Sequence, residues 1–284
     1  MKKIIVALTV ILIAVYATLA FLGSGGEYAS EKLLYKIMKG ASAISLNPDA
    51  APPAQLAAVE RDLKTLISKY PGTRSAKIAH IALMEFYVAN KKYSEAAAFA
   101  ATIEKTYAAD AELLSTAQFL LGTAYEKQGS WSKALAEFKI LEEKYPHTQL
   151  GMQIPIYIGK YYEAKGKDAE ARSAYKEAVN FYSNMEKEYS NKVLGYTASV
   201  LLIQSYLNMN DYEAAGNMVD KTLHKYASRL SFMQLLPYVE NIYIKKLNQP
   251  EKAIELYKYV MDKIKDPRMI KLLNKKIEEI KAKK

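Results

Sequence analysis

The stretch from Ser115 to Pro146 reads STAQFLLGTAYEKQGSWSKALAEFKILEEKYP. Its small residues, Gly122 and Ala134, are of the kind that lets two helices cross closely, because a larger side chain would push the helices apart. Its aromatic residues, Tyr125 and Phe138, are large enough to fill the volume between helices. These residue types are suited to packing helices together, so we interpret the stretch as one structural unit and its characteristic residues as structural.

Most of the remaining sequence contains copies of the same unit. Each copy has an alanine that corresponds to Ala134, and these are Ala96, Ala134, Ala171, Ala215 and Ala253. Successive alanines are 38, 37, 44 and 38 residues apart, and the 44-residue step predicts a longer second helix, from Ala169 to about Tyr189. In the last and weakest copy we align Ile244 with Tyr125 and Tyr257 with Phe138.

The stretch resembles the tetratricopeptide repeat, because Leu121-Gly122, Tyr125, Ala134, Phe138 and Pro146 have that family's spacings, with Gln118 in place of its usual Trp. The resemblance covers roughly residues 53 to 265. It implies an all-α solenoid of antiparallel helix pairs, wound as a right-handed superhelix. Members of this family are mostly non-enzymatic scaffolds that hold a peptide or helix in a concave groove, which the first helix of each repeat lines.

The tyrosine–proline repeat ends and the long period also resemble bacterial envelope members of the family. These include BamD-like proteins, which assemble outer-membrane proteins, and Tol–Pal coordinator proteins. BamD-like proteins carry a lipidated cysteine, whereas this chain contains no cysteine. An anchor in the inner membrane therefore fits the N-terminus better than a lipid anchor.

The resemblance also implies which residues would line the groove. Carried over repeat by repeat, they are Ile81, Glu85 and Val88; Phe119, Thr123 and Glu126; Ile156, Lys160 and Glu163; and Val200, Gln204 and Leu207. This mixture of apolar and polar side chains suggests a helix or an extended peptide as the ligand. The alternative, that these are ordinary half-exposed surface residues, stays open.

The N-terminus indicates a membrane location. Lys2 and Lys3 precede an apolar run at residues 4–22, which as a helix would span roughly 28 Å, close to the ~30 Å of a bilayer core. We expect residues 1–22 to form an uncleaved transmembrane anchor, with residues 23–30 as a flexible spacer. The basic end should stay in the cytoplasm, which places the body in the periplasm. A cleaved signal peptide and a secreted or periplasmic protein are the alternative.

The body divides into a cap, an array and a tail. Residues 31–76 are predicted to form capping helices or a degenerate repeat, and residues 77–265 the repeat array. Residues 266–284 are predicted to form a basic capping helix, with Asp266 as its N-cap and Pro267 in its first turn. Its apolar stripe is Ile270, Leu273, Ile277 and Ile280, with Lys271, Lys275, Lys276 and Lys281 off it.

The charge and the residue types limit the partners and the chemistry. The formal net charge is +10, and much of it lies in the C-terminal tail, which suggests an anionic lipid or an acidic partner there. Bases would be stacked by an aromatic-interleaved basic motif, which is missing, so nucleic acid is disfavoured. The three histidines are His80, His147 and His224, and they lie in different repeats without metal-ligand spacing. We therefore predict no metal, no cofactor and no enzymatic activity.

Two classes of function remain in the sequence. The first is a membrane-tethered scaffold on the extracytoplasmic side, which binds a protein or peptide as part of an envelope assembly, secretion or cell-wall complex. The second is a periplasmic receptor for a small ligand or a glycan, which would require an enclosed pocket. A BamD-like role in assembling outer-membrane proteins is a further alternative.

Overall fold

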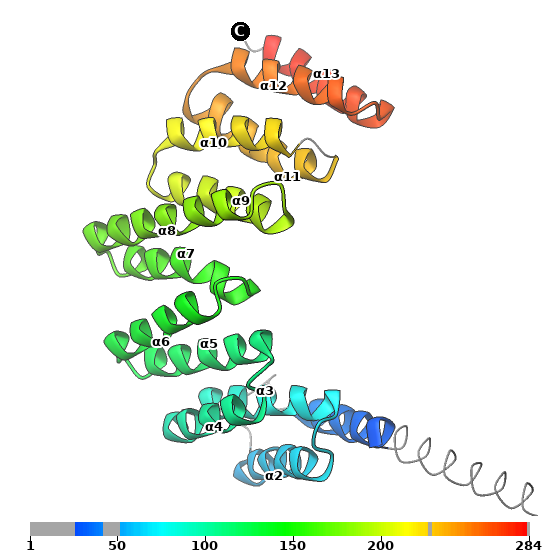
Figure 1. Ribbon diagram of the computed structural model, residues 1–284, viewed down its shortest axis with the longest axis vertical. Helices are drawn as coiled ribbons and strands as arrows, with labels where there is room; N and C mark the ends of the chain where they lie inside the picture. Colours follow the sequence, from blue (N-terminus) through cyan, green and yellow to red (C-terminus); the bar gives the residue numbers. More distant parts are fainter. Residues whose placement is uncertain (1–25, 42–51, 227–228, 283–284) are drawn as a thin grey trace, which may run out of the picture. The chain divides into compact units, whose positions relative to one another are not determined.

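The computed structural model describes residues 26–41, 52–226 and 229–282, all of which lie in helices or in the turns between them (Figure 1). The predicted anchor at residues 1–22 lies outside these ranges, as do residues 23–25 of the predicted spacer. Within the ranges, no helix combines the length and the apolar character needed to cross a membrane. The all-α prediction is confirmed, and the winding into a right-handed superhelix stays a prediction.

The chain divides into two compact units, Met1–Leu150 and Gly151–Lys284. The described helices of the first unit are a helix at residues 26–41, α2 (Pro53–Lys69), α3 (Arg74–Ala89), α4 (Tyr93–Thr106), α5 (Ala111–Lys127) and α6 (Trp131–Lys144). From α2 onward, each helix packs against the next one in the chain, and α3 also packs against α5. We call the pair α3–α4 the first repeat and α5–α6 the second.

The second unit holds three further repeats and a final helix. They are α7 (Gln149–Ala164) with α8 (Asp168–Glu188), α9 (Val193–Asn208) with α10 (Tyr212–Lys225), and α11 (Arg229–Val239) and η2 (Glu240–Lys246) with α12 (Pro250–Lys263), followed by α13 (Pro267–Lys281). We call these the third, fourth and fifth repeats. The 21-residue α8 is longer than the second helices of the other repeats, which confirms the extension predicted from the 44-residue step.

The turn between the two helices is built in the same way in every repeat. One residue has a left-handed backbone, and these residues are Lys91 (φ 59°), Gly129 (φ 80°), Gly166 (φ 66°), Asn210 (φ 58°) and Asn248 (φ 52°). In the first four repeats, the next N–H donates to the carbonyl of a tyrosine five positions earlier, at 2.8–2.9 Å. This bond and the left-handed residue end the first helix as a Schellman motif. Each turn lies five residues before the repeat's alanine, so the two features share one period.

The small residues lie where the helices approach most closely. The five repeat alanines are all buried. A Cβ added at Gly122 would overlap the ring of Phe138, and one added at Gly159 would overlap the ring of Tyr175. The packing role predicted for the glycines, alanines and aromatic residues is therefore confirmed. Trp131 begins α6 as Tyr93 begins α4, so the two aromatic residues occupy equivalent positions.

The extension of α8 carries a buried carboxylate. Glu186 is 3% exposed and accepts hydrogen bonds from Lys221, at 3.2 Å, and from Lys225, both on α10. Burial raises the pKa of Glu186, but the two lysine hydrogen bonds outweigh that effect and hold the pKa below its ordinary value. The ion group thus joins the end of the third repeat to the fourth.

The fifth repeat contains one residue more than the others before its turn. The left-handed residue follows the tyrosine by four positions in the first four repeats, whereas Asn248 follows Tyr243 by five. The additional residue is accommodated in η2, a π-helix, whose wider turn takes one residue more than an α-turn. The alignment of Ile244 with Tyr125 is therefore wrong: Tyr243 is buried against Gly216, and Ile244 is only partly buried.

The final helix largely follows its prediction. The Asp266 side chain accepts from the N–H of Arg268 at 2.9 Å, and Pro267 is the first residue of α13, so the predicted cap is confirmed. The buried face consists of Met269, Leu273, Ile277 and Ile280. Ile270 is only partly buried, which corrects its place in the predicted stripe. Lys276 is half-buried and pairs with Glu240 of η2 at 2.7 Å.

Candidate functional site

An apolar groove opens in the first unit between the helix at residues 26–41, α2 and α3. Its volume is about 340 Å³. The main apolar side chains that line it are Ile37, Met38, Leu56, Val59, Leu63 and Phe86. Met38 is 45% exposed although it is apolar, so the groove exposes apolar surface to solvent.

Glu85 is the single charged residue among those that line this N-terminal groove. It lies on α3, one turn of helix from Ala82 and Ala89, which also line the groove, and it is an exposed residue. Partial desolvation at the groove raises the pKa of Glu85 above its ordinary value. A cation brought into the groove would offset that desolvation, so the site suits an apolar helix face that carries one lysine or arginine.

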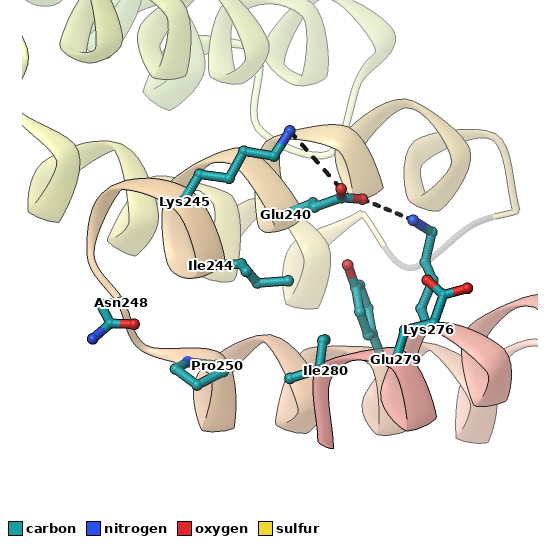
Figure 2. A pocket seen from close by; sticks show the side chains of 9 residues that line it. Glu240, Ile244, Lys245, Asn248, Pro250, Lys276, Glu279 and Ile280 are labelled. Carbon is teal, nitrogen blue, oxygen red and sulfur yellow. Dashed lines mark hydrogen bonds and ion pairs between the residues drawn. The ribbon is translucent and has the colours of Figure 1, made fainter. Parts of the chain in front are cut away.

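A second pocket, of about 280 Å³, lies in the second unit between η2, α12 and α13 (Figure 2). Ile244 of η2 and Ile280 of α13 contribute apolar surface, and Glu240 lies between two lysines. The Glu240 carboxylate is 2.7 Å from Lys276 Nζ and 4.0 Å from Lys245 Nζ. The pocket thus combines an apolar wall with charged groups of both signs.

Tyr257 of α12 also lines this C-terminal pocket. Its side chain is fully buried, and its hydroxyl has no hydrogen-bond partner within the described ranges of the chain. Burial, and to a smaller extent the charge of Glu240, raises the pKa of Tyr257 to about 12, so the phenol keeps its proton at neutral pH. A buried donor without an acceptor is costly, and it is an uncommon feature of a folded protein.

The described part of the chain holds no group of three or more residues that could bind a metal ion. His80 is buried, with Nδ1 2.7 Å from the Ala76 carbonyl oxygen and 3.2 Å from the Tyr107 hydroxyl. Burial lowers the pKa of His80 below its ordinary value, so the ring is neutral at neutral pH. His80 is therefore a packing residue of the first repeat.

Comparison with known families locates one unit directly. Residues 116–148 match the tetratricopeptide repeat. This segment is the second repeat, α5–α6, and it includes most of the stretch that predicted the fold. The recognition of the tetratricopeptide repeat from sequence is thus confirmed. The envelope resemblance to BamD-like and Tol–Pal coordinator proteins is not confirmed.

The chain is also similar to solved structures. One is a tetratricopeptide repeat protein from Parabacteroides merdae, with 13% identity, coverage of 90% of this chain and 88% of that chain, and a TM-score of 0.38. Another is BtubC from P. vanneervenii, with 13% identity, coverage of 89% and 91%, and a TM-score of 0.33. No curated protein sequence matches this chain.

The structure separates the predicted groove residues of the first repeat. Glu85 lines the N-terminal groove, as described above. Val88 is 3% exposed and belongs to the core. Ile81 is partly buried and packs against the cluster that contains Met84 and Ile103. Only Glu85 of the three is therefore part of a hollow surface.

The predicted residues of the tetratricopeptide repeat at 116–148 are all half-buried. The Phe119 ring lies 5.9 Å from the ring of Phe138, so it contributes to packing between α5 and α6. Thr123 donates its hydroxyl to the Phe119 carbonyl at 2.9 Å, and Glu126 lies one turn further along. Binding by these three residues stays a prediction.

The predicted residues of the third and fourth repeats also differ in exposure. Ile156 is 6% exposed and is part of the core, whereas Lys160 and Glu163 are exposed. Glu163 accepts a hydrogen bond from the Tyr175 hydroxyl at 2.7 Å. Val200, Gln204 and Leu207 are half-buried, and the two apolar ones pack against the core.

Sequence reasoning missed the apolar residues of the N-terminal groove and all of the C-terminal pocket. Residues 31–76 were interpreted as a cap, yet Ile37, Leu56 and Val59 of that segment form one wall of the groove. The signal available was the pair of apolar stripes on the two capping helices. The C-terminal pocket had a weaker signal, the additional residue between Tyr243 and Asn248.

Proposed function

We propose that the chain is an interaction scaffold that binds an amphipathic helix of a partner protein in the N-terminal groove. The observation that carries the proposal is a hollow apolar surface with the one carboxylate of Glu85 in its wall. An amphipathic helix would bury its apolar side chains against Ile37, Leu56 and Val59, and its own lysine or arginine would pair with Glu85. The tetratricopeptide repeats then serve to hold this groove on a rigid frame.

The proposal includes the envelope location predicted from sequence. Residues 4–22 would tether the chain to the inner membrane, with the body in the periplasm and the partner in an envelope complex. Protease added to cells without an outer membrane should digest the body only if it lies outside the inner membrane. The alternative of a cleaved signal predicts a mature chain that lacks the apolar segment, which the mass of the purified protein distinguishes.

A photo-crosslinking residue at Met38 tests the groove in living cells. We expect one adduct of defined mass from position 38 and none from a matched probe at Val193, which is 83% exposed on the second unit. Glu85→Lys should remove the adduct, and reversing the charge of the partner's basic residue should restore it. An adduct that forms equally well with Glu85→Lys would contradict the proposed pairing.

A further inference from the structure

The fifth repeat differs from the third at one hydroxyl. Tyr175 and Tyr257 occupy the same position, four residues after the repeat alanines Ala171 and Ala253. Tyr175 is 2% exposed, and its hydroxyl donates to the Glu163 carboxylate at 2.7 Å. Tyr257 is 0% exposed, and its hydroxyl has no acceptor among the described residues. The two repeats therefore bury the same donor, and only one of them supplies a carboxylate for it.

The missing acceptor follows from the additional residue in η2. Glu163 directly follows the tyrosine of its repeat and lies three positions before the left-handed residue. In the fifth repeat the residue directly after the tyrosine is Ile244, and the residue three positions before the left-handed residue is Lys245. Neither can accept a hydrogen bond from a phenol. In their place the C-terminal pocket opens beside Tyr257, and a π-helix of this kind frequently accompanies a functional site.

We propose that the C-terminal pocket binds the carboxylate of a ligand that has a short apolar body. The ligand carboxylate takes the place that Glu163 fills in the third repeat and accepts a hydrogen bond from the Tyr257 hydroxyl. The apolar body lies against Ile244 and Ile280, which reach into the pocket from η2 and α13 (Figure 2).

The charges around the pocket balance, because two lysines and two glutamates line it. Lys245 lies 4.0 Å from Glu240 and is 63% exposed, so its ammonium can turn to a ligand at small cost. Glu240 would repel an anion, but Lys276 neutralises it at 2.7 Å. Glu279 also lines the pocket, and its side chain is 55% exposed, so water screens its charge. Lys245 is thus the second group that we assign to the ligand carboxylate.

The Tyr257 hydroxyl is itself buried, so the proposed ligand must displace the side chains that cover it. Tyr175 is as buried as Tyr257, and yet its hydroxyl meets Glu163, whose side chain reaches it from an exposed position on α7. A ligand carboxylate in the pocket of about 280 Å³, which Tyr257 helps to line, would make the equivalent contact. The internal repeat thus provides the template for the bound state.

Hexanoate tests the proposal, with the neutral isostere hexanamide as its control. The full chain, held in a non-ionic detergent and labelled at the isoleucine methyl groups, should show shifts of the Ile244 and Ile280 signals on titration. We expect a dissociation constant of about 1 mM or tighter for hexanoate. Hexanamide should bind at least about ten-fold more weakly, because it carries no charge for Lys245.

Two tyrosine variants form the matched pair. Tyr257→Phe removes the unpaired hydroxyl and should weaken hexanoate binding by about ten-fold or more while the chain stays folded. Tyr175→Phe removes the paired hydroxyl and should leave hexanoate binding unchanged. Lys245→Gln should weaken hexanoate binding by about the factor that separates hexanoate from hexanamide. Equal binding to the wild type and to Tyr257→Phe would overturn the proposal, as would the absence of any shift up to about 50 mM hexanoate.

Short peptides distinguish the source of the carboxylate. A tripeptide with an apolar C-terminal residue is compared with the same tripeptide as its C-terminal amide. Binding of the acid alone identifies the end of a polypeptide as a ligand, and binding of hexanoate alone identifies a small organic acid. Equal binding of the acid and the amide would contradict a carboxylate site.

Discussion

The third and fifth repeats share the same helix packing but differ in the surroundings of one buried tyrosine hydroxyl. Both place an alanine at the helix crossing and a tyrosine one turn later. In the third repeat the tyrosine hydroxyl donates a hydrogen bond to Glu163 of the same repeat. In the fifth, one additional residue widens the first helix and leaves Tyr257 beside a pocket. The same packed tyrosine is therefore paired in one repeat and unpaired beside a pocket in the other.

The largest expected effect concerns the room for a side chain at the glycine that packs against a buried tyrosine. At Gly159 an added Cβ would overlap the Tyr175 ring, whose hydroxyl is held by Glu163 and cannot easily move. At Gly216 the nearest atom, on Tyr243 of η2, would be 3.1 Å away. Gly159→Ala should therefore cost about 2 kcal/mol of unfolding free energy, whereas Gly216→Ala should be close to neutral, because the helix propensity of alanine offsets the small displacement. Urea unfolding of both variants measures the difference, and equal costs would contradict it.

The second prediction contrasts two carboxylates that join neighbouring helices. Glu186, at the end of the third repeat, is buried between Lys221 and Lys225, whereas Glu240 of the fifth repeat is 37% exposed. Glu186→Gln should cost about 2 kcal/mol, and Glu240→Gln less than about 1 kcal/mol. Urea unfolding at neutral pH tests the ranking.

The same carboxylate sets an acid dependence. The pKa of Glu186 is lower in the folded chain than its ordinary value of 4.5. The unfolded chain therefore binds the proton first as the pH falls, so the contribution of Glu186 is complete above that value and is lost through the folded pKa. Stability measured from pH 6 to pH 3 should fall less steeply in Glu186→Gln than in the wild type. A parallel fall would show that Glu186 does not titrate in this way.

The fourth prediction is a difference in sign between two identical substitutions. Tyr175→Phe breaks the bond to Glu163 and should destabilise the chain by about 1 kcal/mol, because its acceptor is charged but exposed. Tyr257→Phe removes a donor that is unpaired in the free protein, and should be neutral or slightly stabilising. Thermal unfolding of the two variants without added ligand provides the comparison.

The smallest effect concerns the turns. Gly166 and Asn248 are the left-handed residues of the third and fifth repeats. Gly166→Ala should cost about 1 kcal/mol, because alanine is strained in this conformation. Asn248→Ala should cost about half as much, since asparagine already bears part of that strain. Replacing either residue by the other should change stability by less than the alanine substitutions do.

Much of the fold could be predicted because the small residues define where helices meet. Gly122, Ala134 and Phe138 fixed the register of one repeat, and the spacing of the other alanines placed the rest. Ile244 was the wrong residue to align with Tyr125 because the alignment assumes the same separation between this position and the repeat alanine in every repeat. A π-helix adds one residue within that separation, and no residue type in the sequence indicates its presence.

The candidate site was less predictable, because exposure depends on neighbouring elements. Val88 and Ile156 have groove positions by family register, but other helices of their units cover them. Glu85 lies in a groove because the helix at 26–41 and α2 form the other walls. The family register includes neither of these helices. The burial of Tyr257 without an acceptor likewise could not be predicted without knowing where α13 lies.

The shared turn has a consequence for how the chain folds. Each Schellman motif closes hydrogen bonds between residues at most six positions apart, and each repeat alanine packs within a helix pair. Contacts of such short sequence separation cost little loop entropy and form quickly. We therefore expect the repeats to fold in microseconds to milliseconds, so that a body leaving a narrow channel could acquire its structure one helix pair at a time.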